Sequence, residues 1–460
     1  MTTTTLASPA KDHRDWAGLP VDLLRCAFQL LSVPSRVCFR GVCRSWQQAA
    51  AAEDKPTTAM PPPWVVIPHD IGCSKSFTLL SIPTMQSFRW SPPGGLGGLR
   101  CVGSSGGWLA GAYIDAGRMK RVALVNPLTG ARVEVPASPG RAFAAAARYG
   151  HADFQEAALC RAFQKVAFAP NPTARDFAVA VVTQLQRPVR FGKAVAFARA
   201  GHDGWCALAE LPDDEHSRPC SYKSRLDVAY RDGKFYYVTS CRQVWVVDMA
   251  AAHPSPAPLA RLIEPSPGCH FSCNYHIAFS GDGALHVVWS PADDVADSVY
   301  VLAQRYDPTS SPVQGAWTEA RRLRGQAFLA GDLNQTLCVA AGGGDGEWLE
   351  PGSVYFTNTT LCSLLAEEHR ESRLNGVGVW RFDLATGDIG QPSSQVRKAP
   401  VVVRPLDLSR PAWTVHQDVA EADPTPEETW KYPQPALDWT TAVCNRIWFP
   451  RVVSLDFESI

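Results

Sequence analysis

A repeated strand–turn–strand pattern fills the chain from residue 64 onward and constrains its fold more than any other feature. Short apolar runs alternate with turns rich in Gly, Asp, Asn or Pro. The repeats recur at irregular spacings of about 45–75 residues, which is typical of propeller blades with insertions. The pattern predicts a mainly β chain that forms a β-propeller, with six blades favoured and seven as the alternative. The segments that align best are RVALVNPLTGARVEV, VYVLAQRYDPTSSP and VGVWRFDLATGDI, and then LDVAYRDGKFYYV with IAFSGDGALHVVW.

The stretch before residue 60 is helical by the spacing of its apolar residues. Its first helix carries apolar residues at three- and four-residue steps, which place them on one face: Leu24, Ala27, Phe28 and Leu31. Pro34 ends this helix and opens a short second one. A third helix has its own apolar stripe, formed by Phe39, Val42, Cys43, Trp46 and Ala50. The predicted domains are a three-helix head over 15–52, a linker over 53–63, and a propeller over 64–460 with a Pro-rich segment near 391–439.

Charge and cysteine content limit the possible classes of function. Lys plus Arg and Asp plus Glu number 44 each, so the basic excess of a protein that binds nucleic acid is missing. No apolar run approaches the roughly 20 residues of a membrane helix. The start MTTTTLASPAKDHRD has no apolar core for a signal peptide, and 14 cysteines are scattered through the chain. We therefore expect a cytoplasmic and/or nuclear protein without nucleic-acid or membrane partners.

The segment CHFSCNYH is the nearest approach to a metal site. On a strand, Cys269 and Cys273 share one face and His276 points to the other. No second Cys/His pair follows at the spacing of zinc ligands. The sequence therefore predicts ordinary core packing here, with no metal and no cofactor.

Ser105 lies in the segment CVGSSGGWLAG, which satisfies the Gly-x-Ser-x-Gly pattern of a serine nucleophile. That chemistry needs a helix directly after the serine, whereas WLAGAYIDAGR alternates like a strand. We predict a tight turn into a strand, with Gly103, Gly106 and Gly107 supplying unusual backbone angles and Trp108 packing between blades. Ser105 is thus not expected to be catalytic.

The helical head resembles the F-box at both ends of that family's pattern. The pattern is a Leu-Pro pair, then acidic-Leu-Leu, and later Val-Cys-Arg/Lys-x-Trp. Ala27 departs from it, because a larger aliphatic residue is usual there. The resemblance implies docking to a Skp-type adaptor and, through it, to a cullin–RING ubiquitin ligase. The adaptor-binding residues that it implies are Leu19, Pro20, Leu23, Leu24, Val42, Cys43 and Trp46. The alternative is a helical hairpin that merely caps the next domain.

The remainder of the chain resembles the KIB-type β-propeller domain that follows an F-box in a family of plant proteins. The matching motifs lie at Gly103–Leu109, Asn126–Gly130, Asp227–Tyr236 and Val354–Thr357. With the head included, the resemblance covers nearly the whole chain. The departures are insertions: an Ala-rich stretch, a glycine loop and the Pro-rich segment.

Together the two resemblances imply a non-catalytic substrate receptor of a Skp–cullin–F-box ligase, in which the propeller binds an unknown target protein. The alternative is a propeller that binds other ligands or acts as a small-molecule enzyme, with the helices as a cap unrelated to a ligase. Because binding specificity usually resides in insertions, the inserted loops are the candidate target contacts. These loops are 141–163, 212–222 and 342–352, and they include Asp213, Asp345 and Trp348.

Overall fold

The structure is a computed structural model of the 460-residue chain. It describes residues 16–31, 33–40, 42–53, 64–68, 75–81, 87–92, 96, 98–115, 120–136, 159, 162–186, 191–202, 204–210, 226–239, 241–263, 273–291, 301–310, 315–331, 334–342, 349–356, 380–390 and 447–449. Within these residues the chain forms two compact units, one of helices and one of strands.

The helical unit contains a short 3-10 helix and three α-helices. They are η1 (Trp16–Gly18), α1 (Val21–Leu30), α2 (Val33–Arg40) and α3 (Arg44–Glu53). Helix α1 begins directly after Pro20, whose carbonyl accepts hydrogen bonds from the backbone N–H groups of Leu23 and Leu24 at 3.0 and 3.1 Å. Asp22 places a negative charge in the first turn, where the helix dipole favours it.

Aromatic packing holds the three α-helices together. Phe28 of α1 meets Phe39 of α2 edge to face at 5.3 Å, and Phe39 lies 4.3 Å from the Trp46 ring of α3. Arg36 donates to the Gln29 carbonyl at 2.9 Å and to the Leu31 carbonyl at 3.0 Å, at the end of α1 where helix carbonyls lack intrahelical donors. It also donates to the Phe28 carbonyl at 3.1 Å. Its guanidinium also lies 5.2 Å from the centre of the Phe28 ring.

Within the described residues the strands form six sheets, each named below from one edge strand to the other. The first three are β25 (Ile447–Phe449), β1 (Trp64–Pro68), β2 (Phe77–Ser81), β3 (Ser87–Trp90); β4 (Arg100–Ser105), β5 (Trp108–Ile114), β6 (Lys120–Val125), β7 (Arg132–Glu134); and β8 (Lys165–Phe168), β9 (Ala178–Gln186), β10 (Phe191–Arg199), β11 (Trp205–Glu210). The others are β12 (Val228–Arg231), β13 (Lys234–Val238), β14 (Gln243–Asp248), β15 (Pro256–Arg261); β16 (Cys273–Phe279), β17 (Leu285–Pro291), β18 (Leu302–Asp307), β19 (Ala316–Glu319); and β21 (Leu337–Ala340), β20 (Gln326–Ala330), β22 (Ser353–Phe356), β23 (Trp380–Asp383), β24 (Ile389–Gly390).

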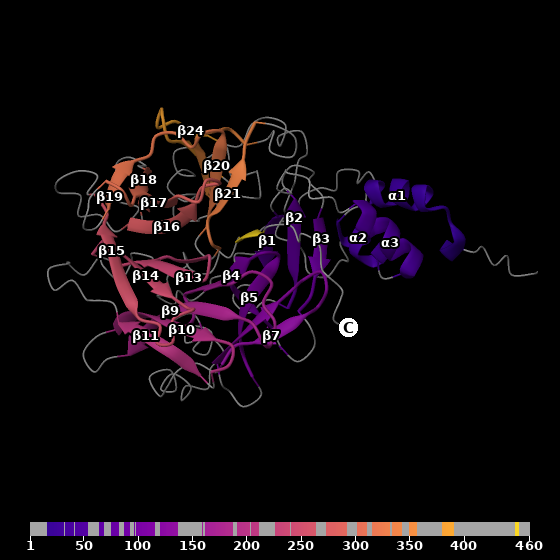
Figure 1. The fold of residues 1–460 in the computed structure, drawn as a ribbon, viewed down its shortest axis with the longest axis horizontal. Helices are drawn as coiled ribbons and strands as arrows, with labels where there is room; N and C mark the ends of the chain where they lie inside the picture. The colour runs from indigo at the N-terminus through magenta and orange to yellow at the C-terminus, as the bar shows by residue number, and fades with distance from the viewer. Residues whose placement is uncertain are drawn as a thin grey trace, which may run out of the picture. The chain divides into compact units, whose positions relative to one another are not determined.

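The sheets are arranged around a common centre, as Figure 1 shows. The first-named edge strand of each sheet contacts that of the next sheet: β25 contacts β4, β4 contacts β8, β8 contacts β12, β12 contacts β16, and β16 contacts β21. Radial repetition of small antiparallel sheets is the architecture of a β-propeller. The structure thus confirms the predicted mainly β propeller. Strand β25 pairs with β1, so the two ends of the strand region share one sheet.

Alternating side chains of each strand pack against the two neighbouring sheets. In the fourth sheet, Val228 and Phe235 lie in a hydrophobic cluster with Phe197 of the third sheet. Ala229 lies in another cluster, with Ile277 of the fifth sheet. Successive residues of a strand point to opposite faces, so one strand can serve both clusters. Consecutive residues along a strand can therefore all be apolar, because both faces of each sheet are buried.

A buried ion pair joins the third and fourth sheets. Lys165, at the start of β8, pairs with Asp227, just before β12, and both side chains are almost fully buried. Lys165 Nζ also donates to the Asn334 carbonyl at 2.7 Å. Asp227 accepts from the backbone N–H of Val228 at 2.7 Å and of Ile277 at 2.5 Å. One ion pair therefore links four of the six sheets.

Candidate functional site

Helix α1 exposes apolar residues beside its buried face. Leu24 points into the helical core and is 1% exposed, whereas Leu23 and Leu30 are 57% and 87% exposed. Cys26 and Ala27, which lie between them on the same side of the helix, are also exposed. We call Leu23, Cys26, Ala27 and Leu30 the α1 stripe. Exposed apolar stripes of this kind mark interaction surfaces.

The residues predicted to bind an adaptor separate into three environments. Pro20, Leu23 and Val42 are exposed, Leu19, Cys43 and Trp46 are half-buried, and Leu24 is buried. Leu24 fills the core of the helical unit, and its contact with an adaptor stays a prediction. The i+7 relation of Leu30 to Leu23 could have identified Leu30 from the sequence, yet the family pattern does not include it.

Val42 does not belong to the apolar face of the third helix, contrary to the prediction from the sequence. It lies in the turn before α3, which begins at Arg44, and is 55% exposed. Trp46 packs its ring on Phe39, and its indole N–H donates to the Trp16 carbonyl at 2.9 Å. Trp46 therefore connects η1 to α3, and only part of its ring is left accessible to a partner.

The turn at Ser105 joins two strands and leads into no helix. Ser105 ends β4 and pairs with Trp108, the first residue of β5. Gly106 and Gly107 have φ values of +53° and +84°, which L side chains rarely adopt. Trp108 lies in a hydrophobic cluster with Phe168 of the third sheet, as predicted for packing between sheets. The segment lacks the strand–turn–helix that holds a serine nucleophile.

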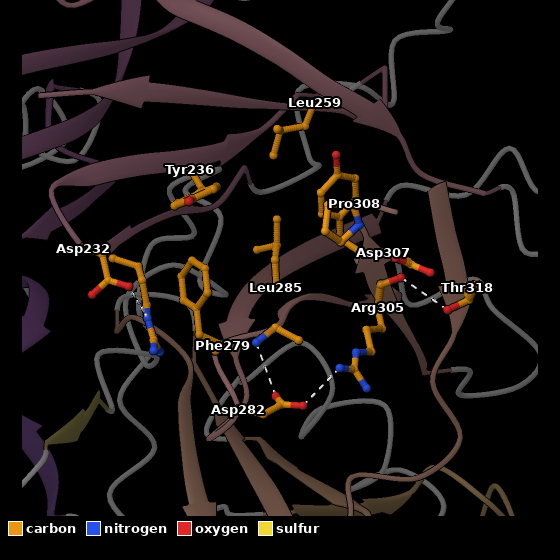
Figure 2. Close-up of a pocket in the computed structure, with 14 residues that line it drawn as sticks. Asp232, Tyr236, Leu259, Phe279, Asp282, Leu285, Arg305, Asp307, Pro308 and Thr318 are labelled. Atoms are coloured by element: carbon orange, nitrogen blue, oxygen red, sulfur yellow. Dashed lines mark hydrogen bonds and ion pairs between the residues drawn. The ribbon is translucent and has the colours of Figure 1, made fainter. Parts of the chain in front are cut away.

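A hollow of about 670 Å³ lies between the fourth and fifth sheets, and Figure 2 shows the residues that line it. Its apolar part comprises Tyr236, Leu259, Phe279, Leu285, Tyr306 and Pro308. Its charged residues are Arg231, Asp232, Asp282, Arg305 and Asp307. We call it the inter-sheet hollow. Its size is within the range of ligand-binding sites, and the sequence did not predict it, because the lining comes from turns and strands of two sheets.

Ion pairs and hydrogen bonds order the charged side of the inter-sheet hollow. Arg305 lies 3.0 Å from Asp282, and Arg231 lies 3.1 Å from Asp232. The hydroxyl of Ser280 lowers the pKa of Asp282, and Thr309, through its hydroxyl and its N–H, lowers the pKa of Asp307. Both carboxylates are therefore charged at neutral pH.

The predicted target loops fall partly outside the described residues. Loop 212–222 with Asp213, the positions Asp345 and Trp348, the Pro-rich segment and Cys269 all lie there. The described ends of the other two loops are partly buried, and target contact by these loops stays a prediction. Leu159 and Phe163 are buried in the cluster that holds Trp108, and Leu349 is also buried.

The same three loops join the ring at two opposite ends. Loops 141–163 and 212–222 precede β8 and β12, and the Lys165–Asp227 pair joins the start of β8 to the residue just before β12. Loop 342–352 instead follows the end of β21, where Ala340 pairs with Gln326. The Gln326 side chain accepts a hydrogen bond from Gly281, just after the end of β16. The inter-sheet hollow lies at this second end.

The described part of the chain holds no group of His, Cys, Asp and Glu side chains that could bind a metal ion. His276 lies buried in β16, edge to face with Phe356, and its Nε2 is 3.4 Å from the Ser290 hydroxyl. None of the described helices is long and apolar enough to span a membrane.

Comparison with known families agrees with the two units. Residues 16–55 match the F-box domain, and residues 79–381 match the KIB1-4 β-propeller. The molecule is thus an F-box protein with a propeller body. The chain belongs to the KIB1-4 β-propeller family, because that match covers more than half of its length. Both resemblances inferred from the sequence motifs are confirmed.

Three solved structures show weak similarity to this chain, and the search of curated proteins found no match. TolB from Acinetobacter baumannii is 11% identical over 64% of this chain and 61% of its own, with a TM-score of 0.31. The chain thus spans less than two thirds of TolB. The Cps50 (Swd1) β-propeller domain of Myceliophteria thermophila is 9% identical over 72% and 86%, with a TM-score of 0.29. Apo AztD from Citrobacter koseri is 11% identical over 72% and 81%, with a TM-score of 0.30.

Proposed function

We propose that the chain is the substrate-recognition subunit of a Skp–cullin–F-box ubiquitin ligase. An F-box domain implies binding of a Skp-type adaptor in a cullin–RING ligase, and a propeller fits a non-catalytic receptor. The observation that carries the proposal is the exposed α1 stripe on an F-box whose core is already filled by Leu24 and Phe28. Bound in this way, a target protein would have its lysines held at high effective concentration near the conjugating enzyme.

The proposal assigns different roles to the residues that the sequence singled out. Pro20, Leu23 and Val42, together with Leu30, would contact the adaptor, because they are exposed. Leu24 would support this surface from the core. Leu19, Cys43 and Trp46 would contribute what half-buried side chains leave accessible. Residues near Asp213, Asp345 and Trp348 stay candidate target contacts.

The finer architecture also belongs to the proposal. We take each of the six sheets among the described residues as one blade and the helical unit as a three-helix F-box. The domain limits stay at 15–52 for the F-box, 53–63 for the linker and 64–460 for the propeller. A plant source and a cytoplasmic and/or nuclear location stay predictions from the sequence.

A pull-down with Skp-type adaptor tests the role of the α1 stripe. Leu23→Asp and Leu30→Asp each place a charge on the exposed stripe, so each variant should fold normally and bind the adaptor about 2 kcal/mol more weakly, roughly 30-fold. The matched control is Ile263→Asp, since Ile263 is a similarly exposed apolar residue, at 51%, on the propeller. Wild-type adaptor binding by both stripe variants, with unchanged circular dichroism, would refute the proposal.

A further inference from the structure

The inter-sheet hollow combines an apolar lining with an unbalanced set of charges. Tyr236 and Phe279 meet edge to face at 5.1 Å, and Leu259 and Leu285 line the hollow close to them, as Figure 2 shows. Such a surface can cover the methylene stem of a long side chain. The lining therefore suits an occupant that is apolar along its length and charged at its tip.

The charged residues of the hollow indicate whether the end of the occupant is positive or negative. Arg231 is paired with Asp232, and Arg305 with Asp282. A third carboxylate, Asp307, accepts hydrogen bonds from the N–H and the hydroxyl of Thr309, at 2.8 and 2.7 Å. Arg305 also helps to lower the pKa of Asp307 through space, but its ion pair is with Asp282, and among the described residues no Lys or Arg forms an ion pair with Asp307. The hollow thus holds one more negative than positive charge.

An anionic occupant fits this site less well than a cationic one. To bind Arg231 or Arg305, an acidic peptide would have to displace Asp232 or Asp282 from an existing ion pair. Arg231 also lies over the Phe279 ring at 5.4 Å, a contact that its redirection would weaken. A cationic side chain can approach Asp307 without breaking either pair.

We propose that the inter-sheet hollow binds a linear peptide segment of the target protein by receiving a lysine or arginine side chain whose charge meets Asp307. This inference rests on the proposed function, because it assigns the target class of the same receptor. The stem of the side chain lies along Tyr236, Phe279 and Leu285, and the ammonium or guanidinium group pairs with the carboxylate. The hollow lies at the end of the ring where loop 342–352 begins.

The chain itself supplies a conservative variant and a matched control. Asn126 holds the equivalent β6–β7 turn by accepting from the N–H groups of Leu128 and Thr129, at 3.0 and 3.1 Å. Asp307→Asn should therefore keep the β18–β19 turn and remove only the charge. The control is Asp383→Asn, because Asp383 accepts from Ala385 and Thr386 in the β23–β24 turn, away from the hollow.

The test is an oriented peptide library bound to the full-length chain. The central residue of each peptide is fixed in turn to every amino acid, phosphoserine included, and the flanking positions are randomised. We expect central Lys and Arg to be enriched about fivefold or more over Gln. Asp307→Asn should abolish this preference, and Asp383→Asn should retain it. Raising salt to about 0.5 M should also remove it in the wild-type chain, because the pair is solvent-accessible.

Several results would overturn the inference: enrichment of acidic or phosphorylated residues, absence of any central preference, or a Lys/Arg preference that survives Asp307→Asn or high salt. The melting temperature of each variant is measured alongside. If Asp307→Asn unfolds, the peptide preference of the wild-type chain and its salt dependence still test the inference. Adaptor pull-down from the same preparation reports on the head alone, so failure of peptide selection is distinguishable from failure of the ligase function.

Discussion

Lys165 and Asp227 show at the scale of single residues how the ring is held at its centre. Burial raises the pKa of the Asp227 carboxyl, and the Lys165 ammonium and two backbone N–H groups oppose that shift. The sequence marked Asp227 as part of a family motif, but it could not identify the partner. Lys165 lies in the neighbouring sheet, and charge pairing between sheets leaves no local sequence pattern. Breaking such a pair leaves an uncompensated buried charge.

We expect Lys165→Met to lower the free energy of unfolding by about 3–5 kcal/mol, because Asp227 would stay buried without its cation. Adding Asp227→Asn should recover part of that loss, since an amide oxygen can still accept from Val228 or Ile277. Urea denaturation of the three variants, including Asp227→Asn alone, measures both effects. A loss below about 1 kcal/mol for Lys165→Met would show that the pair is dispensable.

At the scale of elements, the sequence located strands and turns well but could not say why certain glycines are needed. Gly106 and Gly107 have the positive φ values that the predicted turn requires, whereas Gly103 does not. Gly103 instead allows β4 to approach β8, because a Cβ there would lie 2.0 Å from the Val166 carbonyl oxygen. The contact is between sheets, and a strand pattern records only its own alternation.

Gly103→Ala should therefore loosen the packing of β4 on β8. The added methyl would meet backbone rather than a flexible side chain, so we expect a loss of about 2–4 kcal/mol in unfolding free energy. The matched control is Gly204→Ala, whose Cβ would meet nothing within 4 Å and which should change stability by less than about 0.5 kcal/mol. Equal stabilities of the two variants in chemical denaturation would contradict the close-approach argument.

At the scale of the whole molecule, the order of segments predicted a propeller, but the closure of the ring did not follow from the sequence. Strand β25 pairs with β1, and Trp64 lies opposite Phe449 in that pairing. These two strands are almost 400 residues apart in the sequence, and no repeated motif indicates that they pair. The sequence also could not show which loops lie on the same side of the propeller, because this depends on the direction in which each strand runs. For this reason the sequence could not show that the inserted loops, all candidate target contacts, join the ring at two different ends.

The ring closure predicts an asymmetric response to shortening the chain from its C-terminus. A chain ending at residue 449 keeps β25, whereas one ending at 446 loses the strand that pairs with β1 and contacts β4. Because β1 would lose the strand that pairs with it and β4 would lose a packing neighbour, we expect the shorter chain to melt at least about 5 °C lower. The chain ending at 449 is its control and should melt within about 2 °C of the full chain. Adaptor binding should survive in both, since the α1 stripe belongs to the helical unit. Equal melting temperatures of the two truncated chains would mean that β25 does not close the ring.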